Sequence, residues 1–353
     1  MKALIVPQAG KLQLANIPPP EIGPYDALAR IEVCGICNST DQKLIEGTMY
    51  WAPPFPITLG HESVGTVIEV GAKVRKFKVG DRVTRPIYVP PPGKTALNSA
   101  LGGLAELGVV CDLSAMLQDG DRSLADDYNA PRQLVVPPGV SATEAALAIS
   151  LSETASVPHH LPEVRGKNVV VAGTGVAGLA FGLWLKLGGA RVITLGRRAE
   201  RLEKARALGA DVLINTRQAD WRGRIRRAVG GEVDGMIEAT GDATLAGALV
   251  ELLTPGGFAS AYGVPPRGVG YPPPWKASVS EEFLSFDWVL DLIQRRWVKP
   301  EWFITHTWKF HEVTAAFEQV KRGAVLPPGR RRIAAWGDVR HDPPAASRTV
   351  HKV

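Results

Sequence analysis

The stretch VVVAGTGVAGL, residues 169–179, decides the fold of this chain of 353 residues. It opens with apolar, mostly β-branched residues, which predict a buried strand over Asn168–Ala172. Three glycines follow at Gly173, Gly175 and Gly178, and apolar residues continue beyond them in a helical pattern. A glycine-rich turn of this spacing, between a strand and a helix, is typical of a site that binds the pyrophosphate of a dinucleotide.

Each glycine has a physical role in such a turn. Gly173 permits the tight turn, Gly175 lets the backbone approach the pyrophosphate, and Gly178 allows the helix to pack closely on the strand. Thr174 and Val176 lie between them and are assigned to the same cofactor site, where the first N–H groups of the helix point at the phosphates. The alternative is a glycine-rich turn without a ligand, which is less common in this context.

Strands and helices alternate through the second half of the chain. The predicted strands are Asn168–Ala172, Arg191–Leu195, Asp211–Ile214 and Gly235–Glu238, and the predicted helices are Val176–Leu187, Arg198–Leu208, one near Gly223–Val229, Glu281–Arg296 and Phe310–Lys321. This alternation predicts βαβ units and a doubly wound parallel sheet, hence an α/β protein. The first half has short apolar runs punctuated by Gly and Pro, such as Leu28–Val33, Val64–Val70 and Arg82–Thr84. These runs predict a β domain.

The end of the second predicted strand indicates which dinucleotide is bound. A site for NAD usually has Asp or Glu there, because a carboxylate holds the 2′-hydroxyl of the ribose. Here the strand is followed by Gly196, Arg197 and Arg198, so no acid stands in that place. Glycine leaves room for a 2′-phosphate, and guanidinium groups bind phosphate. We expect NADP(H) to be preferred over NAD(H); the alternative is that both arginines are exposed residues at a helix start.

Charge and hydropathy argue against a nucleic-acid-binding protein and against a membrane-spanning protein. The formal net charge is +6, and residues 197–227 contain ten Lys or Arg against four Asp or Glu. Such a run usually covers solvated helix faces, and because no nucleic-acid-binding motif accompanies it, we expect no nucleic-acid partner. The segment Val169–Leu185 lacks charged residues, but its glycines fit a strand and a helix better than a membrane span.

The number of cysteines and the N-terminal segment indicate the cellular compartment of the protein. The chain has three cysteines, at Cys34, Cys37 and Cys111, and this low, odd number argues against a disulfide scaffold. The first residues lack the long apolar core and cleavage site of a secretory signal. We therefore expect a cytoplasmic protein.

Two motifs in the first half carry possible metal ligands. They are Cys34-Gly-Ile-Cys37-Asn-Ser-Thr-Asp41 and Gly60-His61-Glu62. Alone, a C-x-x-C could be half a zinc knuckle or a redox pair, and a lone histidine is more often structural. Together with the glycine fingerprint they resemble the medium-chain dehydrogenase/reductase family, in its zinc-dependent alcohol dehydrogenase group. The resemblance covers residues 1–335 and includes LGHESVGTVIEVGAKVRKFKVGDRV, RLEKARALGAD, DGMIEATG and LLTPGG.

This resemblance implies a fold of two domains. A GroES-like β catalytic domain would occupy residues 1–152, and a Rossmann domain, the doubly wound parallel sheet, residues 153–297. The chain would return to the catalytic domain over residues 298–337. The segment after Arg332 lacks periodicity, so we expect residues 338–353 to form a largely disordered tail.

The resemblance also implies one catalytic zinc. Cys37 and His61 match the first two ligands, and Glu153 in EAALAISLSETAS matches the third, which is Glu in the sorbitol-dehydrogenase-like branch. Glu62 is the alternate ligand. Such a set leaves one position open for substrate or water. The structural zinc lobe of many relatives needs four cysteines, and since only Cys34 and Cys111 remain, we expect no structural zinc.

The same resemblance implies roles for further residues. Asp41 would orient His61, the alternative being a helix N-cap. The family motif has one residue fewer after the cysteine, so either Thr40 or Ser39 carries the hydroxyl that relays the proton, and we favour Thr40 because it precedes Asp41. Lys43 stands where many relatives have the histidine that ends the relay; the alternative is a solvent-exposed lysine. Thr240, in DGMIEATG, would contact the cofactor.

The predicted function is hydride transfer between NADP(H) and a small-molecule alcohol or polyol, or its carbonyl counterpart. Relatives assemble as dimers or tetramers, so we expect a homodimer or homotetramer. Two alternatives stay open. One is a zinc-free quinone or enoyl reductase of the same family, and the other is a catalytically silent NADPH-binding protein.

Overall fold

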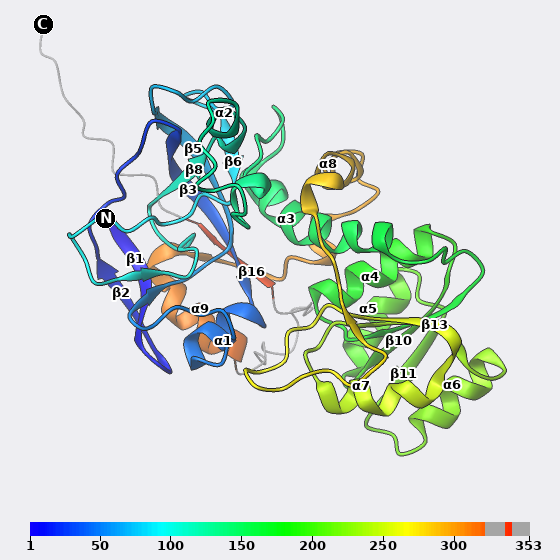
Figure 1. The fold of residues 1–353 in the computed structure, drawn as a ribbon. Helices are drawn as coiled ribbons and strands as arrows, with labels where there is room; N and C mark the ends of the chain where they lie inside the picture. Colours follow the sequence, from blue (N-terminus) through cyan, green and yellow to red (C-terminus); the bar gives the residue numbers. More distant parts are fainter. Residues whose placement is uncertain (322–335, 341–353) are drawn as a thin grey trace, which may run out of the picture.

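A parallel sheet forms the centre of the second half of the chain (Figure 1). Its strands are β9 Asn168–Ala172, β10 Arg191–Gly196, β11 Val212–Asn215, β12 Val233–Glu238, β13 Leu253–Ala261 and β14 Lys276–Ala277. The spatial order is β11-β10-β9-β12-β13-β14, and each neighbouring pair is parallel. The chain therefore runs outward in both directions from β9, which creates a crevice at the carboxyl ends of β9 and its neighbours. The structure, a computed structural model, describes residues 1–321 and 336–340.

Helices cover both faces of this sheet. They are α4 Val176–Leu187, α5 Ala199–Ala207, α6 Trp221–Val229, α7 Ala243–Leu249 and α8 Phe286–Gln294. Val169 and Val171 share one core cluster with residues of α4 and α8, whereas Val170 and Ala172 share another with residues of α6 and α7. Successive side chains of a strand point to opposite faces, so the apolar run of β9 is explained by burial on both sides. The predicted α/β class is confirmed.

The first half of the chain is built from β-strands. They are β1 Lys2–Gln8, β2 Lys11–Asn16, β3 Asp26–Cys37, β4 Ile57–Thr58, β5 Glu62–Val70, β6 Arg82–Thr84, β7 Asn98–Ser99 and β8 Leu107–Cys111. β3 is the central element, pairing antiparallel with β5 and β8. Its alternate residues Ala27, Ala29, Ile31 and Val33 are buried, which gives the strand a core face and a more polar face.

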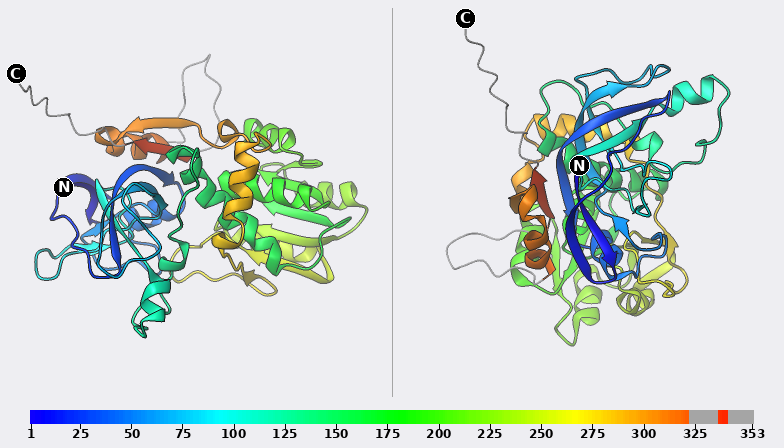
Figure 2. Two further views of the ribbon diagram at one scale, coloured as in Figure 1. Left: turned by 90° about the horizontal axis from the view of Figure 1, so that it is seen from above. Right: turned by 90° about the vertical axis from the view of Figure 1, so that its left-hand side faces the viewer.

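The chain returns to the first half after α8. β15 His306–Lys309 pairs with β16 Trp336–Arg340, and β16 pairs antiparallel with β3. In Figure 2 these orange and red strands lie beside the blue strands of the first half. The predicted disordered tail starts at Asp338, whereas the structure places Asp338–Arg340 in β16, because their backbone pairs with β3 and β15. The rest of that tail, 341–353, lies outside the described residues.

Other helices differ in detail from the predicted pattern. The helix predicted over Glu281–Arg296 is a short 3-10 turn, Glu282–Leu284, followed by α8. The helix predicted over Phe310–Lys321 also starts with a 3-10 turn before α9 Val313–Lys321. The remaining α-helices of the described chain are α1 Thr40–Glu46, α2 Leu113–Gln118 and α3 Ala142–Ser156, and further 3-10 turns are Ala130–Arg132, Val157–His160, Val250–Leu252 and Pro300–Trp302.

Within the described ranges, no helix is long and apolar enough to span a membrane.

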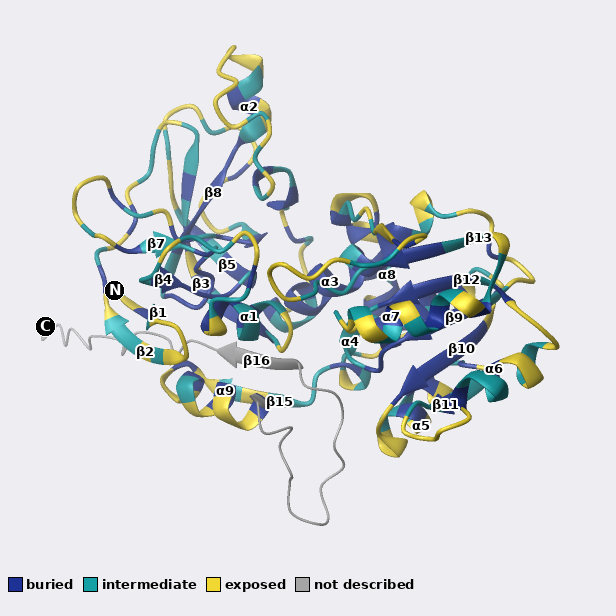
Figure 3. Cartoon of the chain, turned by 60° about the horizontal axis from the view of Figure 1, so that its bottom comes forward, coloured by how far each residue is buried: buried dark blue, intermediate teal, exposed yellow. Residues whose placement is uncertain are grey.

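Helix α3 joins the two halves. It contacts β5 of the first half and both α4 and α8 of the second. Ser141 and Glu144 form a capping box at its start, which satisfies backbone N–H groups that would otherwise lack partners. Figure 3 shows α3 between the two halves, beside strands that are largely buried. Side chains on α3 therefore reach the junction between the halves.

Candidate active site

A cleft of about 1630 Å³ is lined by residues of both halves of the chain. The carboxyl ends of β9, β10 and β12 form one wall, and the end of β3 and the start of β5 lie on the other. This is where open parallel sheets bind their ligands. The site residues predicted from the sequence all line the cleft except Asp41 and Gly178, which are buried behind its wall.

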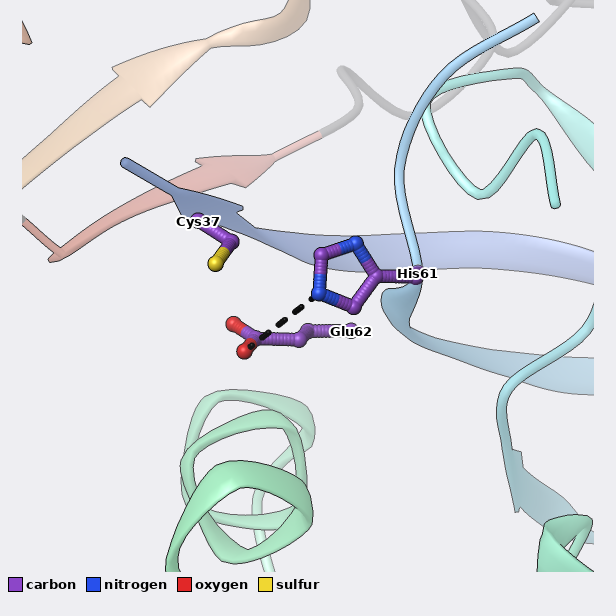
Figure 4. A group of neighbouring side chains, drawn as sticks. All are labelled: Cys37, His61 and Glu62. Atoms are coloured by element: carbon purple, nitrogen blue, oxygen red, sulfur yellow. Dashed lines mark ion pairs between the residues drawn. The ribbon is translucent and has the colours of Figure 1, made fainter. Parts of the chain in front are cut away.

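Three possible metal ligands meet in this cleft. Cys37 ends β3, Glu62 begins the neighbouring strand β5, and His61 directly precedes Glu62. One ligand atom from each of the three lies within 4.8 Å of the others (Figure 4). Gly60 brings the chain into position with a φ of +97°, and a Cβ there would lie 2.6 Å from the backbone nitrogen of Leu104. A thiolate, an imidazole and a carboxylate at this spacing suit Zn²⁺.

Asp41 orients two members of this group. Its Oδ1 lies 3.2 Å from Nδ1 of His61, and its Oδ2 accepts a hydrogen bond of 2.9 Å from the backbone N–H of Cys37. Ser39, not Asp41, occupies the N-cap of α1. Burial lowers the pKa of His61, but the contacts with Asp41 and Cys37 outweigh it, so the pKa is raised well above its usual value. Nδ1 thus faces Asp41, and Nε2 faces the other ligand atoms.

Glu62 is fixed by Ser150, which lies within the stretch EAALAISLSETAS but was assigned no role there. The hydroxyl of Ser150, on α3, donates a hydrogen bond to Oε1 of Glu62. The same oxygen lies 3.9 Å from Nε2 of His61. Ser150 is 88 residues from Glu62 along the chain, so only the packing of α3 against β5 brings them together.

Glu153 stands apart from this group and faces a buried arginine. Its Oε2 lies 3.5 Å from Nη2 of Arg85, and it is outside the ligand group found among residues 1–321. Burial raises the pKa of Glu153, and Arg85 partly opposes that shift. Arg85 also makes two hydrogen bonds to Glu282, of 2.7 and 2.6 Å, and donates one of 2.8 Å to the backbone oxygen of His61. Neither Arg85 nor Glu282 lies in a motif that indicates a functional residue.

The relay candidates lie at the start of α1. Nζ of Lys43 donates a hydrogen bond of 2.8 Å to Oγ of Ser39. Burial lowers the pKa of Lys43, while the nearby thiol of Cys37 acts in the opposite direction. The backbone N–H of Thr40 lies 3.4 Å from Sγ of Cys37. Ser39 and Thr40 both line the cleft, and Lys43 is bonded to Ser39 rather than exposed without a partner.

The glycine fingerprint has the expected geometry. Gly173 has a φ of +126°, and a Cβ at Gly178 would lie 2.2 Å from the backbone oxygen of Gly173. Gly175 is the N-cap of α4, and a Cβ there would meet nothing within 4 Å, since it faces the cleft. Thr174 and Val176 line the cleft beside it. The helix therefore presents free N–H groups to a phosphate.

A group of arginines surrounds the end of β10. Arg197 and Arg198 are exposed, line the cleft, and form no ion pair within the described part of the chain. Arg201 and Arg217, which the sequence did not single out, line the same region. Burial lowers the pKa of Arg201, and the neighbouring Arg198 acts in the same direction. Unpaired guanidiniums in a cleft favour an anionic ligand.

Thr240 lies at the end of β12, opposite the glycine turn. Its backbone N–H donates a hydrogen bond of 2.6 Å to Glu238, and its hydroxyl donates to the same oxygen. Glu238 is buried and also accepts from the hydroxyl of Tyr271 and from the N–H of Gly241. This network fixes the loop that carries Thr240 to the wall of the cleft.

Comparison with known proteins agrees with the fold. The family described as "Zinc-binding dehydrogenase" matches residues 176–279, and "Alcohol dehydrogenase GroES-like domain" matches residues 23–118. Sorbitol dehydrogenase of Gallus gallus is 28% identical over 334 residues, covering 91% of this chain and 93% of the relative. Alcohol dehydrogenase of Geobacillus stearothermophilus is 30% identical over 274 residues, covering 77% of this chain and 80% of the relative.

A solved structure extends this likeness to the whole fold. The alcohol dehydrogenase of Thermus sp. ATN1 has a TM-score of 0.76 at 23% identity, covering 97% of this chain and 100% of that one. With both halves matched in sequence and in fold, the chain belongs to the zinc-type alcohol and polyol dehydrogenases of the medium-chain dehydrogenase/reductase family, and sorbitol dehydrogenases are among its relatives.

Proposed function

We propose that this oxidoreductase is zinc-dependent and transfers hydride between NADP(H) and an alcohol or polyol, or its carbonyl counterpart. The observation that carries the proposal is that Cys37, His61 and Glu62 share one cleft with the glycine turn of β9 and α4. In such a cleft the reacting carbon of a substrate and a nicotinamide ring can be held together, away from bulk water.

The donor set fits a single zinc ion. Cys37 and His61 would supply sulfur and nitrogen, and the geometry favours Glu62 over Glu153 as the carboxylate, because Glu62 is in the group of neighbouring ligand atoms. A bound zinc ion would act as a Lewis acid toward the substrate oxygen. Asp41 holds the imidazole of His61 so that Nε2 remains available to a metal.

The proton is handled at the start of α1. The hydroxyl of Thr40 lines the cleft beside Cys37 and is our candidate for exchanging a proton with the substrate oxygen. A second candidate has its own supporting contact, since Ser39 is bonded to Lys43 and could pass a proton to its amine. Substitution of each hydroxyl separates the two candidates.

The preference for NADP(H) is supported by charge. Gly196 leaves no carboxylate to repel a 2′-phosphate, and Arg197 and Arg198 are unpaired beside it in the described chain. We also propose a cytoplasmic homodimer or homotetramer. The three free cysteines are in keeping with a reducing compartment.

Metal analysis combined with a substrate panel tests the proposal. We expect about one zinc per chain and oxidation of alcohols or polyols that is faster with NADP⁺ than with NAD⁺. Two zinc ions per chain would show that the count is wrong. Quinone or enoyl reduction by protein free of zinc would favour the zinc-free reductase, and NADPH binding without turnover of any substrate would favour a silent binding protein.

A further inference from the structure

Arg85 is held in an unusual backbone conformation at the wall of the cleft. It directly follows β6, and its φ of +52° lies in the left-handed region, which residues with a side chain rarely adopt. Its backbone N–H donates a hydrogen bond of 2.7 Å to the oxygen of Ser63, and its carbonyl accepts one of 3.0 Å from the side chain of Gln133. Strained backbone persists only where its surroundings fix it, and it is concentrated at functional sites. The conformation of Arg85 therefore points to a role for its side chain.

The guanidinium of Arg85 contacts three parts of the molecule. Its side chain is only 3% exposed. Nε and Nη2 donate hydrogen bonds of 2.7 and 2.6 Å to the two carboxylate oxygens of Glu282, and Nη1 donates one of 2.8 Å to the backbone oxygen of His61. Nη2 also lies 3.5 Å from Oε2 of Glu153. Glu282 belongs to the cofactor half, His61 to the metal end, and Glu153 to α3, which joins the halves. One planar, rigid group thus binds all three parts.

The segment that carries Glu282 is tied to the rest of the molecule at two further points. The backbone oxygen of Ser280 accepts a hydrogen bond of 2.8 Å from Nη2 of Arg132, in the first half of the chain. The backbone N–H of Glu281 donates one of 2.9 Å to Oγ of Ser156, at the end of α3. Glu282 is therefore a fixed anchor, and the guanidinium bonded to it is held in one place.

We propose that Arg85 is a positioning residue for hydride transfer, which keeps His61 in register with the cofactor half through Glu282. The oxygen of His61 that Arg85 binds belongs to the peptide between His61 and Glu62, so this contact fixes the backbone that joins two candidate metal ligands. Hydride transfer requires the reacting carbon and the nicotinamide to be close and aligned, and a misplacement of about 1 Å can cost a hundredfold in rate. This inference rests on the proposed dehydrogenase function.

A double variant removes this contact without leaving a buried charge unpaired. Arg85→Met with Glu282→Leu replaces the ion pair by apolar side chains of similar size, which is often neutral or stabilising. We expect its midpoint in denaturant titration to stay near that of the wild type. The matched control is Arg82→Met with Glu32→Leu. Arg82 also makes two hydrogen bonds to Glu32 and one to the backbone oxygen of Val140, but neither member of the pair lines the cleft.

Two measurements separate positioning from a purely structural role. With Co²⁺ bound in place of zinc, the visible absorption bands report the arrangement of the ligands, and we expect them to change in the Arg85→Met, Glu282→Leu variant but not in the control. In the zinc-loaded protein, kcat for alcohol oxidation should fall by about a hundredfold, whereas KM for NADP⁺ should stay within about twofold. Arg85→Lys keeps the charge, but one ammonium cannot hold both Glu282 and the oxygen of His61 in this geometry. It should show the same spectral change.

Several outcomes would overturn the inference. One is a folded double variant in which either the Co²⁺ spectrum or kcat is unchanged, and another is a control variant that alters both as strongly. A wild-type spectrum in Arg85→Lys would also overturn it, because charge alone would then suffice, as would a wild type that binds no Co²⁺. If the wild type oxidises no alcohol, but its Co²⁺ spectrum responds to Arg85→Lys and not to the control, the proposed function fails and the positioning of His61 stands.

Discussion

The two ends of the cleft are built in different ways. At the cofactor end, Gly173–Gly178 are consecutive in sequence, and their geometry follows from one turn between β9 and α4. At the metal end, the candidate ligands Cys37, His61 and Glu62 lie at the end of β3 and the start of β5, and the residues that hold them come from α1 and α3. The geometry of a local motif is set by residues that are adjacent in sequence. The geometry of a site assembled from distant segments depends on the packing of the whole domain.

The two ends also use charge differently. Around Gly196 the arginines are exposed and unpaired in the described chain, so their charge is available to a ligand. At the metal end, the charge of Arg85 is buried and is neutralised by Glu282 and Glu153. Exposed charge is suited to recognition, and buried paired charge is suited to holding a site in one shape.

Removal of a ligand should produce the largest effect and should be confined to the metal end. Cys37→Ala and His61→Ala should each lower turnover by about a thousandfold or more, because a Lewis acid contributes several kcal/mol to the transition state. Zinc content should fall with activity, while NADPH affinity, measured by fluorescence titration, should remain within about twofold. Cys111→Ala, which removes a buried thiol outside the cleft lining, is the control. If cofactor affinity falls in parallel, the variants have unfolded, and the two ends of the cleft are not independent of each other.

The buried ion pair should matter for stability. Arg85→Gln leaves Glu282 buried without its partner, and the free energy of unfolding should fall by about 3–5 kcal/mol. Arg222→Gln removes an exposed pair with Glu251 and should cost less than about 1 kcal/mol. Denaturant titration of both variants measures the difference. Equal losses would mean that Arg85 acts as an ordinary surface charge does.

The proton relay should give an effect of intermediate size. Thr40→Val should lower kcat by about a hundredfold, the usual contribution of general acid–base catalysis at its lower end. Ser39→Ala should have a much smaller effect. Steady-state kinetics of the two variants, with zinc content measured in parallel, decides between them. The reverse ranking would assign the relay to Ser39 and Lys43, which are joined by a hydrogen bond.

Variants that alter the preference for NADP(H) should have the smallest effect, because the arginines expected to bind the 2′-phosphate are exposed. Arg197→Ser combined with Arg198→Ser should lower kcat/KM for NADPH by about tenfold and leave the value for NADH nearly unchanged. Gly196 is kept in this test, since a Cβ there would lie 2.8 Å from the side chain of Thr174. Arg206→Ser, on α5 but outside the cleft lining, controls for net charge. A wild type that already prefers NADH would contradict the assignment of these arginines.

The class of fold and the dinucleotide turn could be predicted from the sequence alone, as could the position of two candidate metal ligands. Apolar runs and glycine spacing are local properties, and the turn around Gly173 depends on residues next to it in the chain. Cys37 and His61 were recognisable because each lies in a short motif. The helix boundaries at Glu281 and Phe310 were less accurate, because the break between a 3-10 turn and an α-helix depends on what each segment packs against.

Which side chains lie together around Cys37, His61 and Glu62 depends on tertiary packing. The packing of α3 against β5 brings Ser150 to Glu62 and places Glu153 beside Arg85, and the role of Glu153 as a third ligand stays a prediction. Pairing of β16 with β3 likewise depends on residues about 300 positions apart. Spacing along the chain carries no information about such contacts, because they form only when separate elements bury their apolar faces against one another.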